Sequence, residues 1–338
     1  MASIAAGSLD SFFDPGIGPN SDVYSLFVLP DDDIVVGGAF SAFNNNGNYG
    51  YLARLLSDGT LATTFTPGVN STVWAIAPVG TDRLFIGGDF GSVGGQPRTR
   101  LASIRLDGGL VAGFDPGTGP NSTVRALRAL PDQRVLIGGS FNSYAGKPAQ
   151  YLARIGTDGA FDTSFGGSTN FNSTVWSVEV QPDGRIVVTG DFTTFGASPQ
   201  GYVARLSGAG LLDPTLAIGT GANGHVRRGI VHPDGHLLLG GNFSTFSGLN
   251  RPYLVQIFAN PPSNAVGPSI QSIALGAPNQ VLLTIAGTPG QNYKLQSSPT
   301  IGPPVWTQIS TGTLTAPTIV VPQAIPAQTK TIFFRVVQ

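Results

Sequence analysis

Short runs in which hydrophobic and polar residues alternate, separated by Gly, Pro, Asn and Asp, fill the first three quarters of the chain. A side-chain period of two residues is typical of β-strands, because successive residues point to opposite faces of a sheet. The first group of runs occupies residues 23–29, 34–40, 51–56 and 60–65. Pro30 begins the turn after the first run, and Asp58-Gly59 forms the turn before the last. This pattern predicts four antiparallel strands.

The four-run pattern recurs five times, with a period of about 51 residues. Each second run ends in a Gly-Gly-x-Phe string, with Thr for the first Gly in the fourth copy. The first position of the string is Gly37, Gly87, Gly138, Thr189 and Gly240. Glycine there lets neighbouring backbones approach closely. The repeat indicates an all-β fold in which each copy is one blade of a β-propeller.

The two ends of the repeat array complement each other. The fifth copy has three of its four runs and stops near residue 258, whereas residues 8–13 resemble an unmatched fourth run. That segment aligns with the FDTSF string at residues 161–165. We therefore predict a five-bladed β-propeller closed by the N-terminal strand, with residues 9–13 paired beside residues 253–258. Closure would remove a free sheet edge.

Several motifs of the repeat agree in register: Pro-Asp-Gly, Gly-Gly-x-Phe, Ala-Arg-Leu, Asp-Gly and a final Leu-Asp-x-x-Phe. In this combination residues 8–258 resemble the bacterial delta-60 repeat. The resemblance implies a β-propeller found in large surface or secreted proteins, with no defined activity and no catalytic residues. The fourth copy departs from the pattern at Thr189, at residues 207–210 and at Leu216.

The period ends after Phe258, and the organisation of the chain changes. Residues 1–258 are assigned to the propeller, residues 259–268 to a Pro-rich linker and residues 269–338 to a small β-sandwich. The last part contains six strand-like runs, and we expect Trp306 in its core. It resembles the C-terminal sandwich modules of bacterial surface proteins, which anchor, space or dock a neighbour.

The composition excludes several classes of partner. The net charge is −1, with 18 basic and 19 acidic residues and no basic stripe, so we expect no nucleic-acid partner. No apolar run is long enough for membrane insertion. Cysteine is absent, which excludes disulfides and thiolate metal sites. The first ten residues lack the features of a secretory signal, so we expect that this chain carries no leader.

A catalytic apparatus is not evident. Glycosidases need two carboxylates beside the sugar bond. On the first run of each copy, which we expect to be the innermost strand, Glu179 is the only carboxylate beyond the residues that begin the run. Arg128, one blade away at the equivalent position, predicts an inter-blade ion pair instead. We therefore predict that the chain is not an enzyme and uses no cofactor.

Metal binding is also not expected. His225, His232 and His236 belong to the fifth copy, where the last two flank a Pro-Asp-Gly turn that points them apart. The Asp-rich turn at residues 31–33 lacks the alternating ligand pattern of a calcium loop. Turn chemistry accounts for these residues.

A valine begins the first run of each copy, at Val23, Val73, Val124, Val175 and Val226. The residue after each of these repeat valines gives the candidate ligand site. These residues are Tyr24, Trp74, Arg125, Trp176 and Arg227. Five-fold closure would place them in a ring at the entrance of the central channel, where aromatic and Arg side chains suit sugars, carboxylates or a partner protein. The alternative is packing between blades, with the Arg stems covering apolar surface.

These observations predict a non-catalytic structural or binding module displayed on an extracellular surface or a virus particle. Its expected partners are other structural proteins or surface glycans, and it could form a homo-oligomer through the C-terminal sandwich. A carbohydrate-binding, lectin-like propeller and a polysaccharide-acting glycosidase or lyase are the alternatives.

Overall fold

The chain divides into two compact units, Met1–Ala259 and Asn260–Gln338. The computed structural model describes residues 10–166, 171–232, 235–259, 269–277, 280–286, 292–299, 306–316, 318–324 and 332–337. Within these residues the fold is all-β, and the only helical turn is a 3₁₀ segment, η1 (Gly47–Tyr49). No described helix is long and apolar enough to cross a membrane.

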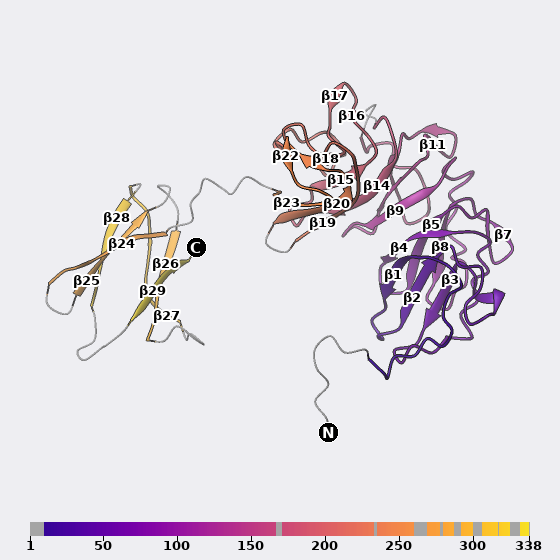
Figure 1. Ribbon diagram of the computed structural model, residues 1–338, viewed down its shortest axis with the longest axis horizontal. Helices are drawn as coiled ribbons and strands as arrows, with labels where there is room; N and C mark the ends of the chain where they lie inside the picture. The colour runs from indigo at the N-terminus through magenta and orange to yellow at the C-terminus, as the bar shows by residue number, and fades with distance from the viewer. Residues whose placement is uncertain are drawn as a thin grey trace. The chain divides into compact units, whose positions relative to one another are not determined.

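The described part of unit 1 contains five three-stranded antiparallel sheets, one for each sequence repeat (Figure 1). In chain order they are β1 (Val23–Val28), β2 (Ile34–Gly38) and β3 (Leu52–Leu55); β4 (Val73–Val79), β5 (Arg83–Gly88) and β8 (Leu101–Arg105); β9 (Val124–Ala129), β10 (Val135–Gly139) and β13 (Leu152–Ile155); β14 (Val175–Val180), β15 (Ile186–Gly190) and β18 (Val203–Leu206); and β19 (His225–Val231), β20 (His236–Asn242) and β23 (Leu254–Phe258). The second strand of each repeat is the central one. The first strand, here called the inner strand, packs against the inner strand of the next sheet from β1 through β4, β9 and β14 to β19.

Two-strand ribbons extend the loop that follows the central strand in four of the repeats. They are β6 (Ser92–Val93) with β7 (Gln96–Pro97), β11 (Ser143–Tyr144) with β12 (Lys147–Pro148), β16 (Thr194–Phe195) with β17 (Ser198–Pro199), and β21 (Thr245–Phe246) with β22 (Leu249–Asn250). In the first repeat η1 occupies this loop.

The predicted fourth strand is wrong as a full strand. In the first repeat it is reduced to a single bridge between Leu55 and Leu61, and the same bridge recurs in the next three repeats. After the bridge the chain turns, because the Phe65 amide donates to the carbonyl of Ala62 at 3.0 Å. This turn carries Phe65 into the core of the following sheet, among Leu84, Ile86 and other buried residues.

The Gly-Gly pair allows sheets and strands to approach closely. A Cβ added at Gly37, Gly87 or Gly138 would lie 2.5–2.8 Å from a Val methyl of the next inner strand. A Cβ at the second glycine would meet a backbone carbonyl oxygen at 2.0–2.2 Å in all five copies, at Gly38, Gly88, Gly139, Gly190 and Gly241. No real side chain tolerates such a distance, so this position requires glycine in every repeat.

Four hydrophobic clusters among the described residues of unit 1 run between neighbouring sheets, whereas a fifth lies on the first sheet alone. Val35 and Leu52 of the first repeat share one cluster with Ile86 and Ile104 of the second. The same arrangement continues to Val187 and Val203, which pack with Leu237 and Leu239 of the fifth repeat. Each sheet therefore depends on its successor for burial of apolar area.

The array has two open ends, and the predicted ring closure is not confirmed. β19 and β1 are not packed together as the other neighbouring inner strands are. Leu26 on β1 is 65% exposed, and Leu254 on β23 is 58% exposed although its counterparts Leu52 and Leu101 are fully buried.

The N-terminal segment also differs from the prediction. Leu9 lies outside the described residues, and Phe13 packs on the core of the first sheet with Val36 and Phe40. The Asp14 amide donates to the carbonyl of Asp58 at 2.9 Å, in the turn after β3. No described residue of this segment is hydrogen-bonded to β23. The reason is that Phe13 occupies the place that Phe65 and Phe114 take on the sheets after their own repeats.

A partly buried Arg from the third strand ties two sheets together. Arg154 forms an ion pair with Asp162 at 2.7 Å and donates across to the carbonyl of Gly208 at 2.8 Å. Arg205 repeats this with Asp213 and Ala259, and Arg54 bonds to Asp33 and to the carbonyl of Leu106. Partial burial acts to raise the pKa of Asp162, but bonds from the Ser164 hydroxyl and the Arg154 guanidinium outweigh it and hold the pKa well below its usual range.

Unit 2 contains two three-stranded sheets among its described residues. One orders β24 (Ser269–Leu275), β25 (Gln280–Ala286) and β28 (Thr318–Ala324), and the other orders β27 (Thr307–Thr313), β26 (Asn292–Ser298) and β29 (Phe333–Val337). Leu283 and Leu295, one from each sheet, share a buried cluster. Trp306 is not in that cluster, which corrects its predicted position: it is partly exposed, with the Arg335 guanidinium 4.4 Å from its ring. The resemblance to surface-protein sandwich modules stays a prediction.

The Gly139→Ala substitution tests the requirement for glycine at the second position of the pair. Its Cβ would meet the carbonyl oxygen of Thr123 at 2.0 Å. We expect the free energy of unfolding to fall by about 3 kcal/mol. Gly113→Ala, where a Cβ meets nothing within 4 Å, is the control and should change it little. The measurement is urea unfolding followed by Trp fluorescence, and equal losses in both variants would contradict the packing argument.

The pH dependence of stability tests the Arg154–Asp162 pair. A carboxyl whose pKa is lowered by folding stabilises the native state above its unfolded pKa, about 4, and this contribution is lost as the pH falls further. We expect Asp162→Asn to cost about 2 kcal/mol at pH 7. The variant should also show a shallower decline of unfolding free energy from about pH 4 to pH 2.

The control for this pair is Asp132→Asn, which removes an exposed carboxylate paired with Arg134. It should cost about 0.5 kcal/mol or less, because solvent screens exposed pairs. A wild-type decline that Asp162→Asn leaves unchanged would show that this pair does not control acid stability.

Candidate ligand site on the inner strands

The five residues predicted as a ring are the bulge residues of the inner strands. The pairing of β1 with β2 skips from Val23 to Ser25, so Tyr24 has no cross-strand partner, and the same irregularity occurs at this place in the other four sheets. A bulge inserts one unpaired residue and turns its side chain away from the alternation of the strand. The repeat therefore presents one side chain per sheet at the same end of the inner strands.

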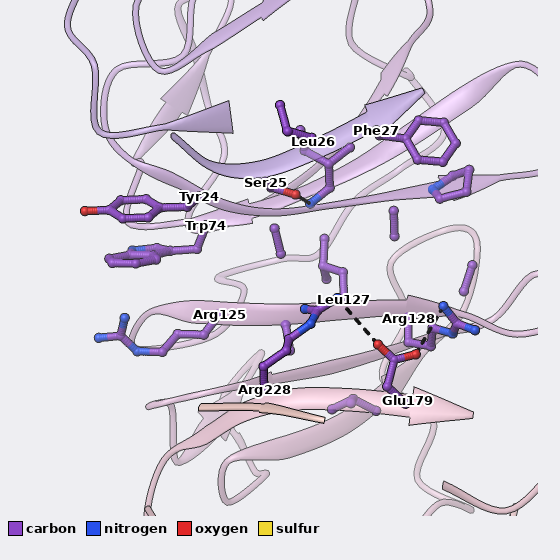
Figure 2. A pocket seen from close by; sticks show the side chains of 17 residues that line it. Tyr24, Ser25, Leu26, Phe27, Trp74, Arg125, Leu127, Arg128, Glu179 and Arg228 are labelled. Atoms are coloured by element: carbon purple, nitrogen blue, oxygen red, sulfur yellow. Dashed lines mark hydrogen bonds and ion pairs between the residues drawn. The ribbon is translucent and has the colours of Figure 1, made fainter. Parts of the chain in front are cut away.

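These side chains contact one another in succession and are called the stack below, although the Trp74 and Trp176 rings are nearly perpendicular, with an interplanar angle of 80°. Tyr24 lies on Trp74 with ring centroids 4.0 Å apart and an interplanar angle of 15°. The Arg125 guanidinium lies between two indoles, 4.7 Å from the Trp74 ring and 4.1 Å from the Trp176 ring. The Arg227 guanidinium also lies over the Trp176 ring, 4.2 Å from its centroid. The structure thus brings all five predicted residues together, as Figure 2 shows for Tyr24, Trp74 and Arg125.

The faces of the rings and guanidiniums in the stack largely contact one another. The polar groups at their edges are therefore what a ligand could reach. The Tyr24 hydroxyl donates to Asp22 at 3.2 Å, and the Trp74 indole N–H donates to Asp89 at 2.7 Å. Nη1 of Arg125 and Nε1 of Trp176 are buried and have no partner among the described residues. Burial lowers the pKa of Arg125, and the carboxylates of Asp89 and Asp191 act against that shift. The predicted packing between blades and the predicted ligand contact are therefore compatible.

A cavity of about 560 Å³ lies beside the stack, lined by residues of all five inner strands. Glu179 projects into it, 13% exposed, with one oxygen 3.4 Å from Nη1 of Arg128 and the other 3.5 Å from Nη2 of Arg228 (Figure 2). The first contact confirms the predicted inter-blade ion pair. The second was missed, although Arg228 stands where the other repeats have only Ser or Ala: Ser25, Ala75, Ala126 and Ser177.

The cavity offers one carboxylate, which bears on hydrolysis. Glu179 is the single acid among the described residues that line it. A two-carboxylate glycosidase mechanism needs a second acid at a separation that sets the stereochemistry. The lining as described does not supply that partner.

His225 and the Asp-rich turn at residues 31–33 contact side chains of the protein itself. His225 contacts Asp191 at 2.7 Å, and Asp31 and Asp33 both bind the Arg54 guanidinium at 2.7 Å. No group of three or more potential metal ligands is found in the part of the chain that the structure describes. Part of the turn between His232 and His236, residues 233–234, lies outside it.

Comparison with protein families supports the repeat. Residues 29–65, 130–165, 181–216 and 232–260 match the family described as "Domain of unknown function (DUF5122) beta-propeller". These segments agree in phase with the third to fifth repeats and the first. The match supports a β-propeller repeat family, and it tests neither the delta-60 name nor the sandwich. No curated protein matches the chain significantly.

Two solved structures show weak similarity in fold. The GH74 xyloglucanase from Xanthomonas campestris is 13% identical, with a TM-score of 0.40, over 88% of this chain and 46% of that one. The chain therefore spans about half the length of that enzyme. A structure titled "Glycoside hydrolase" is 10% identical, with a TM-score of 0.31, over 96% of this chain and 95% of that one.

These matches correct the prediction that the chain is not an enzyme. Both named structures are glycoside hydrolases, so the exclusion of an enzyme is withdrawn. At these scores the similarity defines no substrate and no mechanism for this chain.

Proposed function

We propose that unit 1 is a five-bladed propeller that closes by contact between its first and fifth sheets and binds carbohydrate at the mouth of its channel. The binding proposal rests on the five-residue stack, and the closure proposal rests on the repeated contact between sheets. Display on a cell surface or a virus particle, where polysaccharides occur, is consistent with both.

The repeated contact indicates what the open faces would meet. At each junction with Gly at the first position of the pair, that glycine receives the repeat Val and the residue three places further along the next inner strand. Gly138, for example, receives Val175 and Val178. Gly240 of the fifth sheet has nothing closer than 3.9 Å at its missing Cβ, and its counterparts on the first sheet would be Val23 and Leu26. Both of these residues are exposed on β1.

The one junction that lacks the glycine supports this complementarity. Thr189 stands in its place, and the branched residue that should face it is replaced by Gly229. A Cβ at Gly229 would lie 3.1 Å from the Thr189 methyl. The larger Thr replaces Gly on the fourth sheet, and the smaller Gly replaces a branched residue on the fifth, so the junction stays filled. The first and fifth sheets present the ordinary combination, with Gly on one and Val and Leu on the other.

A disulfide tests closure, in a chain that has no cysteine of its own. A Cβ at Gly138 would lie 3.3 Å from the Cβ of Val175, close to the 3.5–4.5 Å of disulfides, so Gly138→Cys with Val175→Cys is the positive control. We expect Val23→Cys with Gly240→Cys to oxidise within one chain, measured by intact mass and non-reducing electrophoresis. Free thiols, or bonds only between two chains, would refute closure within the chain.

The stack suits a hydroxyl-rich ligand because both donors and acceptors lie along its edges. Guanidinium edges of Arg125 and Arg227 donate, whereas the carboxylates of Asp22 and Asp89 accept. The Arg125 guanidinium contacts the Trp74 and Trp176 rings and that of Arg227 contacts Trp176, so little side-chain entropy is lost when their edges bind a ligand. Small-molecule sites rely on a few precisely placed polar groups of this kind, which fix the orientation of the ligand.

Binding to a glycan array tests the carbohydrate proposal. Trp74→Ala and Trp176→Ala remove the rings that hold Arg125. Each should raise the dissociation constant for the bound glycan at least tenfold, which corresponds to about 1.4 kcal/mol. Trp306→Ala is the matched control, because it also removes a Trp–Arg contact but lies in unit 2. Absence of glycan binding by folded wild type, or undiminished binding in both unit 1 variants, would contradict the proposal.

A further inference from the structure

The cavity beside the stack carries an excess of positive charge. Three guanidiniums line it, those of Arg125, Arg128 and Arg228, against the single carboxylate of Glu179. The whole chain has a net charge of −1, so this excess is local. A concave surface with one sign of charge concentrates ligands of the opposite sign.

The donors of Arg128 and Arg228 are incompletely used. Each guanidinium has five N–H groups, and the ion pairs of these two with Glu179 are 3.4 and 3.5 Å long. Charge-assisted hydrogen bonds are usually 2.7–2.9 Å, as in the inter-sheet pair of Arg154. The side chains are 45% and 67% exposed, and no other ion pair of theirs occurs among the described residues. Two guanidiniums thus share one internal carboxylate and retain donors for a second.

The mouth of the site carries carboxylates as well as the Arg125 and Arg227 guanidiniums. The carboxylates of Asp22 and Asp89 accept hydrogen bonds from Tyr24 and Trp74. The negative charge of Asp191 acts to raise the pKa of Arg125. These acids repel an anion but accept bonds from hydroxyl groups. A fitting ligand therefore has hydroxyls at the mouth and a carboxylate that reaches the Arg128–Arg228 pair.

We propose that the ligand is an acidic oligosaccharide and that the carboxylate of one of its uronic acid residues binds between Arg128 and Arg228. This inference rests on the proposed carbohydrate function and adds the chemical class of the sugar. An acidic peptide carries the carboxylates without the hydroxyls, so it offers no hydroxyl group to the acids at the mouth. Glu179 occupies the anion position when the site is empty and holds the two arginines in place.

The probes are a galacturonic acid hexamer, its fully methyl-esterified form and hexaglutamate, titrated calorimetrically into the full chain. We expect the free acid to bind at least tenfold more tightly than the ester, and hexaglutamate to bind no better than the ester. Arg128→Gln with Arg228→Gln should weaken binding of the acid at least tenfold and so remove its preference over the ester. Arg251→Gln, an exposed Arg that does not line the cavity, is the control and should change neither.

Glu179→Gln distinguishes ligand binding from a structural role. Loss of its charge frees both guanidiniums, so the acid should bind several-fold more tightly while the ester binds as before. A purely structural Glu179 would instead lower thermal stability and weaken both ligands alike. Reducing ends are counted in the same samples, because hydrolysis that Glu179→Gln abolishes would make Glu179 a catalytic acid and overturn its role as occupant of the anion position.

The outcomes separate the two proposals. Equal affinity for acid and ester, a preference that survives the double Arg substitution in a folded protein, or tighter binding of hexaglutamate overturns the acidic-sugar inference alone. Binding of no sugar in either this titration or the glycan array overturns the carbohydrate function on which it rests.

Discussion

The seating of a branched side chain on a glycine of the preceding sheet is the contact on which the rest of unit 1 depends. At Gly37, Gly87 and Gly138 a methyl of the next inner strand occupies the space that a Cβ would need. This approach brings the apolar residues of neighbouring sheets into common clusters, such as Val35 with Ile86. A three-stranded sheet cannot bury both faces alone, so the array is stable only as a succession of such junctions.

The same geometry creates the candidate site. The second glycine lies against the carbonyl of the residue before the repeat Val, and the inner strand bulges beside it. The bulge removes one residue per repeat from the hydrogen-bond ladder and directs its side chain to the end of the strands. Five such residues at one level can stack only because the inner strands lie side by side. Packing and candidate function therefore have a single structural cause.

The Arg residues between the sheets and those in the cavity differ in burial and in the length of their ion pairs. Between sheets, Arg154 and Arg205 have short ion pairs and additional carbonyl acceptors, and their side chains are almost fully buried. In the cavity, Arg128 and Arg228 have long contacts with a shared acid and remain exposed. Satisfied and buried charges specify the register of the sheets, whereas unsatisfied and accessible ones are available to a ligand.

The sequence by itself determined the all-β class, the repeat register and the identity of the five stack residues, because each depends on local alternation and a constant period. Tertiary structure decided that the fourth run is a turn with one bridge, that Phe13 packs on the first sheet, and that Trp306 lies outside the core of unit 2. It also decided that Arg228 meets Glu179, since a pair from different repeats is set by the distance between strands. Periodicity identifies which residues are equivalent, but contacts between equivalents arise only when the sheets have packed.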